Sequence, residues 1–215
     1  MADIIKVEHL SYVYNPGLPT AVTALDDVSF TVEEGDFVGI IGATGSGKST
    51  LITHMNGLNK PTSGKIIIDG TDITNLPEHK RAKYLGRVFQ DPMTSLNPII
   101  TIGKQITSVI MKHQDCTENE ARLRALDLMD KVGIPNPEAR FDDYPFQYSG
   151  GMRQRIVIAI ALSCQPKILI CDEPTTALDV TIQAQILKLL KDLQKEFNYT
   201  IVFITHDLGV VANIA

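Results

Sequence analysis

The sequence lacks the patterns that mark secreted, metal-binding or membrane-spanning proteins. Its three cysteines, Cys116, Cys164 and Cys171, do not have the spacing of a metal site. Their odd number and the absence of a secretory leader favour a reducing compartment. No run of about 18 apolar residues is present, so any membrane role is expected to come through a partner. We therefore expect a cytoplasmic protein.

A strong charge of one sign is also missing. The net charge is -5 at pH 7, and lysine and arginine do not gather into a block, which argues against nucleic acid as a partner. We find neither an internal repeat nor a low-complexity segment. With 215 residues, of which 44% are hydrophobic and 21% charged, the chain can form one globular domain with a sizeable core.

The first third of the chain has the pattern of short strands. Residues 28–32 alternate between apolar and polar side chains, and a second strand is expected over 65–69, before the turn Asp69-Gly70. Between them, residues 37–41 are almost wholly apolar and lead directly into a glycine-rich loop. This pattern predicts a central parallel strand that is buried on both faces.

The remainder of the chain is first helical and then alternates between strand and helix. A capping box at residues 117–120 begins a helix that ends near Gly133, and a second helix is expected over 150–162. The last third carries an apolar strand, an amphipathic helix and a β-branched strand, at 168–171, 182–197 and 200–204. This alternation predicts an α/β fold with a parallel sheet.

A phosphate-binding pattern, G-x-x-x-x-G-K-[ST], lies between an expected strand and an expected helix. Its residues are Gly42, Ala43, Thr44, Gly45, Ser46, Gly47, Lys48, Ser49 and Thr50. The glycines allow backbone N–H groups to surround phosphates, and the helix adds the positive end of its dipole. We expect Lys48 to reach the β- and γ-phosphates of ATP and Ser49 to ligate Mg²⁺. A glycine-rich turn without a ligand is the alternative, and the Lys-Ser pair argues against it.

A second motif is an apolar strand that ends in two carboxylates, Asp172 and Glu173. Asp172 is expected to hold the Mg²⁺ ion, and Glu173 to act as the base on a water aligned with the γ-phosphate. The alternative is an acidic strand end that faces solvent. Pro174 and Asp179 continue a recognisable pattern, which favours the catalytic interpretation.

Residues 148–155, Tyr-Ser-Gly-Gly-Met-Arg-Gln-Arg, resemble the signature of the ABC ATPase family, and this resemblance extends over nearly the whole chain. Ser149 can cap a helix whose first N–H groups are uncovered at Gly150 and Gly151, which makes an anion site. In the family, this site completes the ATP pocket of the opposite subunit. The resemblance therefore implies a homodimer or a heterodimer of cassettes. The chain departs from many members at Tyr148 and Met152.

The resemblance assigns further residues to the ATPase cycle. Gln90 is similar to the Q-loop glutamine, which senses Mg²⁺ and the γ-phosphate and is a further metal-site candidate. Asp179 is similar to the D-loop aspartate, and His206 to the switch histidine, which joins Glu173 and Lys48 as a catalytic residue. Tyr14 is the candidate for stacking on adenine. Tyr12 is the alternative.

The family also implies an architecture and partners. Its fold is a P-loop NTPase core of the RecA type, with an N-terminal antiparallel β subdomain and an inserted α-helical subdomain. Residues 1–89 and 164–215 would form the core of one cassette domain, and residues 90–163 the helical subdomain. Transmembrane permease subunits are the implied partners. The assembled protein would be peripheral on the inner face of the cell membrane.

The two parts of the chain resemble the ATPases of different types of transporter. From about residue 90 onward, the segments 89–98, 148–155 and 172–179 resemble oligopeptide and dipeptide importer ATPases. Residues 1 to about 85 resemble the ATPases of energy-coupling-factor transporters, so we interpret the chain as a chimera joined at 85–90. Related ATPases also continue beyond the last residue, 215, which predicts an unpaired sheet edge here.

Three functions remain open from the sequence. The first is an ATPase that powers solute import, most simply of peptides. The second is an ABC ATPase of DNA repair or translation, which long coiled-coil inserts or two fused cassettes would favour, and neither is present. The third is a cassette that binds nucleotide with little turnover.

Overall fold

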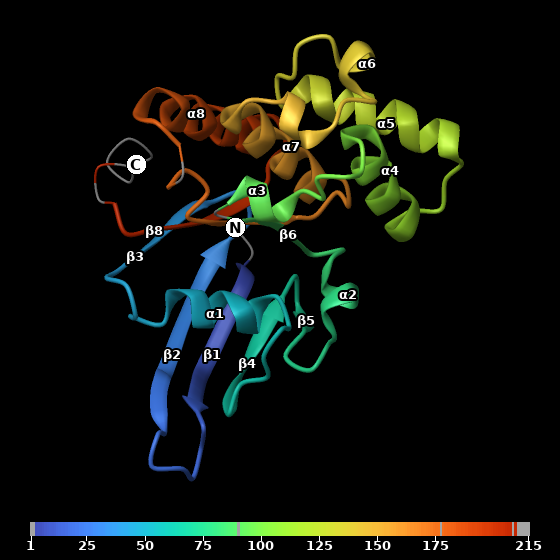
Figure 1. The fold of residues 1–215 in the computed structure, drawn as a ribbon. Coiled ribbons are helices and arrows are strands. Elements are labelled where there is room, and N and C mark those ends of the chain that lie inside the picture. The colour runs from blue at the N-terminus through green and yellow to red at the C-terminus, as the bar shows by residue number, and fades with distance from the viewer. Residues whose placement is uncertain (1–2, 90, 177, 208, 210–215) are drawn as a thin grey trace.

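The computed structural model describes residues 3–89, 91–176, 178–207 and 209. Within these residues the strands form two sheets, each of four strands. The helices gather mainly on one side of the second sheet (Figure 1). None of the helices in these ranges is long and apolar enough to cross a membrane.

The first sheet is antiparallel and has the order β2-β1-β4-β5. Its strands are β1 (Asp3–Tyr14), β2 (Val22–Glu33), β4 (Ser63–Ile68) and β5 (Thr71–Asp72). The long pair β1 and β2 is interrupted by bulges, where His9 and Asp27 both adopt positive φ. The expected N-terminal antiparallel β subdomain is confirmed.

The second sheet is parallel and has the order β3-β8-β7-β6. Its strands are β3 (Phe37–Ile41), β8 (Thr200–Thr205), β7 (Ile168–Asp172) and β6 (Leu85–Val88). The prediction that residues 37–41 form a central, fully buried strand is wrong, because β3 ends the described sheet and is partly exposed. Strand β8, the last described strand in the chain, lies between β3 and β7. An apolar run indicates burial but does not identify the neighbouring strands.

The helices follow the expected pattern closely. They are α1 (Lys48–Met55), α2 (Glu78–Arg81), α3 (Pro92–Ser95), α4 (Ile102–His113), α5 (Glu118–Lys131), α6 (Pro137–Arg140), α7 (Gly150–Leu162) and α8 (Val180–Phe197), with a 3-10 turn at Pro145–Gln147. The predicted capping box of α5 is confirmed, since Thr117 and Glu120 exchange hydrogen bonds. Gly133 follows with φ of 76°, as a left-handed helix end requires.

Two hydrophobic cores lie on opposite faces of the parallel sheet. Along β7, Leu169 and Cys171 belong to a core shared with α4, α5, α7 and α8. Ile168 and Ile170 belong to the other core, which is shared with α1 and the antiparallel sheet. Figure 1 shows α4, α5, α7 and α8 above this sheet, and α1 with the antiparallel sheet below it. Burial on both faces fixes the sheet, and with it the loops at its carboxyl edge.

Candidate functional site

The predicted phosphate loop connects β3 to α1 at the carboxyl edge of the parallel sheet. Gly47 caps α1 with φ of 89°, and a Cβ atom there would lie 2.5 Å from the Ala24 carbonyl oxygen. The Lys48 ammonium group donates to the carbonyl oxygens of Gly42 at 2.6 Å and Ala43 at 2.8 Å. A lysine and the N-terminus of a helix therefore meet at one loop, which is an arrangement suited to phosphates.

Of the two candidate aromatic side chains, Tyr14 lies beside this loop. Its hydroxyl is 3.3 Å from Thr50 Oγ1, and its side chain is exposed. Tyr12 is partly buried, and its ring packs edge-on against His54 at 4.4 Å between centroids. The position of Tyr14 is compatible with adenine stacking, which remains a prediction.

The structure brings Glu173 and His206 together. Glu173 follows β7, and His206 follows the neighbouring strand β8, so both lie at the carboxyl edge. Glu173 Oε1 is 2.9 Å from His206 Nδ1, and Glu173 Oε2 accepts a hydrogen bond of 3.3 Å from the Thr176 hydroxyl. Glu173 has φ of 47°, an uncommon conformation for this residue type that is concentrated at functional sites.

Thr176 and Arg87 contact predicted site residues but were not themselves predicted from the sequence. The Thr176 hydroxyl lies three residues after Glu173, a spacing at which turn side chains often hydrogen-bond. Arg87 Nη2 donates to Asp172 Oδ2 at 2.9 Å. An arginine inside a short, otherwise apolar strand was the available signal, since a shielded arginine needs a partner.

Ser49 and Asp172 have the chemistry that Mg²⁺ prefers. A hydroxyl and a carboxylate are hard oxygen ligands, and Mg²⁺ is usually held by one or two carboxylates together with substrate phosphates. Ser49 is exposed in the first turn of α1, and Asp172 ends β7. The part of the chain that the structure describes holds no cluster of three or more His, Cys, Asp or Glu side chains suited to a metal. By their chemistry, Ser49 and Asp172 fit a Mg²⁺ ion that is also held by phosphates.

The predicted signature forms the start of α7. Ser149 caps this helix, and its hydroxyl accepts a hydrogen bond of 3.3 Å from Met152 N. Gly150 is exposed, whereas Gly151 packs beside Ile182 of α8. Asp179 caps α8 through a hydrogen bond of 3.0 Å from Ile182 N. The exposed start of α7 is therefore a second candidate anion site.

Tyr148 anchors the segment that precedes this helix. It is 2% exposed, and its hydroxyl donates to the Arg140 carbonyl oxygen at 2.5 Å. Burial raises the pKa of Tyr148 to about 12. The tyrosine that departs from the common family pattern thus has a structural role here.

Gln90 lies outside the described residues. The preceding residue, Phe89, accepts a hydrogen bond of 3.2 Å at its carbonyl oxygen from Gln154 Nε2 of α7. The start of the predicted Q-loop is therefore tied to the helix that begins with the signature.

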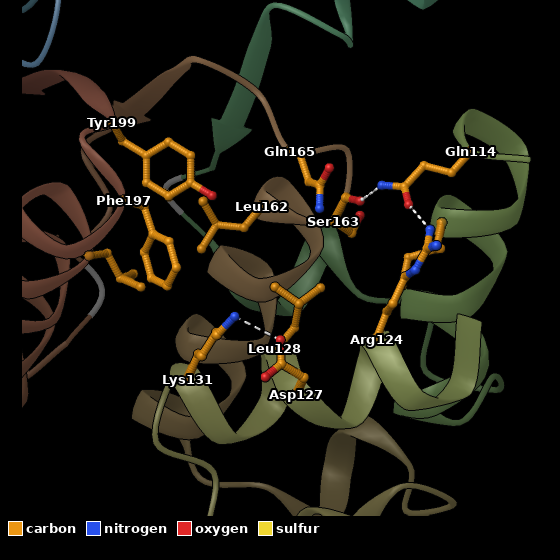
Figure 2. Close-up of a pocket in the computed structure, with 12 residues that line it drawn as sticks. Gln114, Arg124, Asp127, Leu128, Lys131, Leu162, Ser163, Gln165, Phe197 and Tyr199 are labelled. Carbon is orange, nitrogen blue, oxygen red and sulfur yellow. Dashed lines mark hydrogen bonds and ion pairs between the residues drawn. The ribbon is translucent and has the colours of Figure 1, made fainter. Parts of the chain in front are cut away.

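A cavity of about 310 Å³ lies apart from these residues, between α4, α5, α7 and α8 (Figure 2). At its edge, Gln114 Nε2 donates to the Ser163 carbonyl oxygen at 2.7 Å, and Arg124 donates to Gln114 Oε1. Its lining includes none of the residues predicted for the nucleotide site. We interpret it as a junction between helices.

A family model and curated relatives both relate this chain to the ATP-binding proteins of ABC transporters. The family model described as "ABC transporter" matches residues 25–176. The oligopeptide transport ATP-binding protein AmiE of Streptococcus pneumoniae is 57% identical over 203 residues, which cover 90% of this chain and 57% of AmiE. AppD of Bacillus subtilis, of the same description, is 46% identical over 225 residues, covering 100% of this chain and 68% of AppD. The chain thus spans 57% of the length of AmiE.

Solved structures of cassettes share the fold. A dimeric structure of the ATP-binding cassette MJ0796, bound to ADP and phosphate, has a TM-score of 0.82 and 33% identity, covering 97% of this chain and 90% of that one. CbiO1 from Clostridium perfringens, part of the transporter complex CbiONQ, has a TM-score of 0.86 and 34% identity over 98% of this chain and 81% of that one. The predicted fold class is confirmed.

The chimera interpretation finds no support in these comparisons. Similarity to oligopeptide transport ATPases covers 90% of the chain for AmiE and 100% for AppD, and so includes the first part of the chain. The similarity to one type of transport ATPase therefore gives no reason to divide the chain at residues 85–90.

Proposed function

Because this chain belongs to the ABC transporter family, we propose that it is an ATP-binding subunit that hydrolyses ATP to power the import of oligopeptides. The observation that carries this proposal is the carboxyl edge of the parallel sheet. The phosphate loop follows β3, Glu173 follows β7, and His206 follows β8. Ligands of such sheets bind at this edge. Peptides are proposed as the cargo because AmiE and AppD are oligopeptide transport proteins.

In this proposal the phosphates of ATP lie over residues 42–50, where Lys48 exchanges its loop carbonyl partners for phosphate oxygens. Ser49 and Asp172, with Gln90, would hold Mg²⁺. The bound ion would neutralise part of the phosphate charge. Tyr14 would stack on the adenine.

Glu173 would accept a proton from the attacking water. Its carboxylate is held by His206 on one oxygen and by Thr176 on the other, and these contacts support a fixed orientation for a base. His206 would then act by positioning Glu173 and the γ-phosphate. Asp179 would connect the two nucleotide sites.

A second cassette would complete each site. The body of α7 packs in the helical core and its first residue, Gly150, is exposed, whereas α1 packs in the core on the opposite face of the sheet. Residues 149–151 of one copy would therefore cover the phosphate loop of the other. Support comes from MJ0796, a cassette whose structure is dimeric. Transmembrane permease subunits would bind the dimer at the inner face of the membrane.

We further propose that residues 1–89 and 164–215 form the nucleotide-binding core of one domain, and residues 90–163 the helical subdomain. The described helices α3 to α7 lie between Pro92 and Leu162, which supports this division.

ATP turnover and ATP-dependent dimerisation test the proposal in the wild type, Glu173→Gln and Lys48→Ala. We expect Glu173→Gln to bind ATP and dimerise, with turnover lower by about 10²- to 10⁴-fold, because only the base is lost. Lys48→Ala should bind ATP weakly, and the exposed Lys112→Ala should match the wild type. Unchanged turnover in Glu173→Gln would falsify the assigned base. Uptake of labelled peptides into vesicles that carry the permease subunits tests the cargo.

A further inference from the structure

Arg87 forms an ion pair with the carboxylate assigned to Mg²⁺. The two residues lie on neighbouring strands, β6 and β7, and the distance between Arg87 Nη2 and Asp172 Oδ2 is 2.9 Å. Their side chains are only 19% and 16% exposed. Because the pair is largely shielded from water, solvent screens the attraction between the two charges less than it would at an exposed site.

The rest of the Arg87 side chain is held in a fixed place. Its guanidinium group stacks over the Phe89 ring at 4.5 Å from the centroid. Its Nε atom is buried and has no hydrogen-bond partner among the described residues. The negative charge of Asp172 therefore balances the positive charge of the Arg87 guanidinium, which cannot easily move into solvent.

We propose that Arg87 is a positioning residue that pairs with Asp172 before Mg²⁺ arrives and thereby sets the Mg²⁺ requirement of nucleotide binding. This inference rests on the proposed function, which places Asp172 near the phosphates. The guanidinium reduces the attraction of Asp172 for Mg²⁺, since two cations then share one carboxylate. It also reduces the repulsion between Asp172 and the phosphates when Mg²⁺ is absent.

Loss of the Arg87 charge should therefore have two effects of opposite sign. Without Mg²⁺, the unpaired carboxylate repels phosphates, so nucleotide affinity falls. With Mg²⁺, the same carboxylate attracts the ion more strongly, so less Mg²⁺ is needed. A residue that only stabilised the fold would weaken nucleotide binding under both conditions.

The test measures binding of the non-hydrolysable ATP analogue AMP-PNP by calorimetry, in EDTA and at increasing Mg²⁺ concentrations. For Arg87→Gln we expect affinity in EDTA at least about threefold lower, and a Mg²⁺ concentration at half-saturation at least about threefold lower. Arg87→Lys keeps the charge and should stay close to the wild type. Arg87→Met keeps a long side chain over Phe89 and has the same expectations as Arg87→Gln, so a folding defect of one variant leaves the other as the test.

A double-mutant cycle with Asp172→Asn tests whether Arg87 acts through this carboxylate. In the Asp172→Asn background, Arg87→Gln should no longer shift the Mg²⁺ midpoint. If folded Arg87→Gln and Arg87→Met bind AMP-PNP like the wild type, or more weakly under both conditions, this inference is overturned and the proposed function stands. If the wild type itself does not bind AMP-PNP with Mg²⁺, the proposed function fails.

Discussion

Gly45 and Gly47 lie two residues apart in the phosphate loop and differ in the space around them. Both have positive φ, of 84° and 89°. A Cβ atom at Gly47 would meet the Ala24 carbonyl oxygen at 2.5 Å, whereas a Cβ atom at Gly45 would have no described atom within 4 Å outside its two chain neighbours. An alanine at either position is strained, but only at Gly47 must the backbone also move.

We therefore expect Gly47→Ala to lower the free energy of unfolding by about 2 to 4 kcal/mol, and Gly45→Ala by about 1 kcal/mol. The displaced loop should also bind ATP more weakly in Gly47→Ala. Urea unfolding and nucleotide titration measure the two effects. Equal losses in both variants would mean that the contact with Ala24 has no energetic importance.

A second single residue, Tyr148, makes the free energy of unfolding depend on pH. Burial raises its pKa to about 12, above the ordinary value of 10.0 that the unfolded chain has. The folded state then binds the phenolic proton more tightly, so this contribution to stability is complete below pH 10 and is lost as the pH rises to 12. We expect the ionisation of Tyr148 to lower the free energy of unfolding by about 2 to 3 kcal/mol as the pH rises through this range.

Tyr148→Phe tests this contribution by urea unfolding at several pH values. The variant lacks the hydrogen bond to the Arg140 carbonyl oxygen and should be about 1 kcal/mol less stable at pH 8. Between pH 10 and 12, its free energy of unfolding should fall less steeply than that of the wild type. Parallel curves would assign the alkaline loss to other groups with raised pKa, such as Tyr199 and Lys167.

At the scale of elements, Gln114 joins three helices. It follows α4, donates to the Ser163 carbonyl oxygen after α7, and accepts a hydrogen bond from Arg124 of α5 (Figure 2). Both partners would lose a hydrogen bond in Gln114→Ala. We expect a loss of about 1 to 2 kcal/mol in the free energy of unfolding, measured by urea titration.

Lys112→Ala is the matched control for this change. Lys112 lies two residues earlier and is exposed at the end of α4, so its loss should cost less than about 0.5 kcal/mol. If the two variants were equally stable, the bridge through Gln114 would not hold the helices together.

At the scale of the whole molecule, local patterns were predictable and pairings between distant segments were not. The phosphate loop and the capping box of Thr117 each lie within a few residues, so their chemistry can be read directly. The position of β8 beside β3 depends on the global order of strands. The pair of Arg87 and Asp172 depends on the same order, because β6 and β7 are far apart in sequence. Sequence periodicity carries no information on either pairing.

The dimer of the proposed function requires that each site uses residues of both copies, and mixing two inactive variants tests this requirement. Glu173→Gln removes the base from its own site. Gly150→Asp places a negative charge where the other copy's phosphates would lie. Gly150 is the first residue of α7, where an acidic side chain favours the helix, and a Cβ atom there lies 3.7 Å from its nearest neighbour, Leu178, so folding should be retained.

Each variant alone should hydrolyse ATP very slowly. In a mixed dimer, one site carries both defects and the other carries neither. An equal mixture should therefore recover roughly a quarter of wild-type turnover, since half of the dimers are mixed and half of their sites are intact. Turnover of the mixture is measured after exchange of subunits. If each chain completes its own site, the Glu173→Gln and Gly150→Asp defects stay in separate sites and the mixture gains nothing, which would contradict a site shared between two copies.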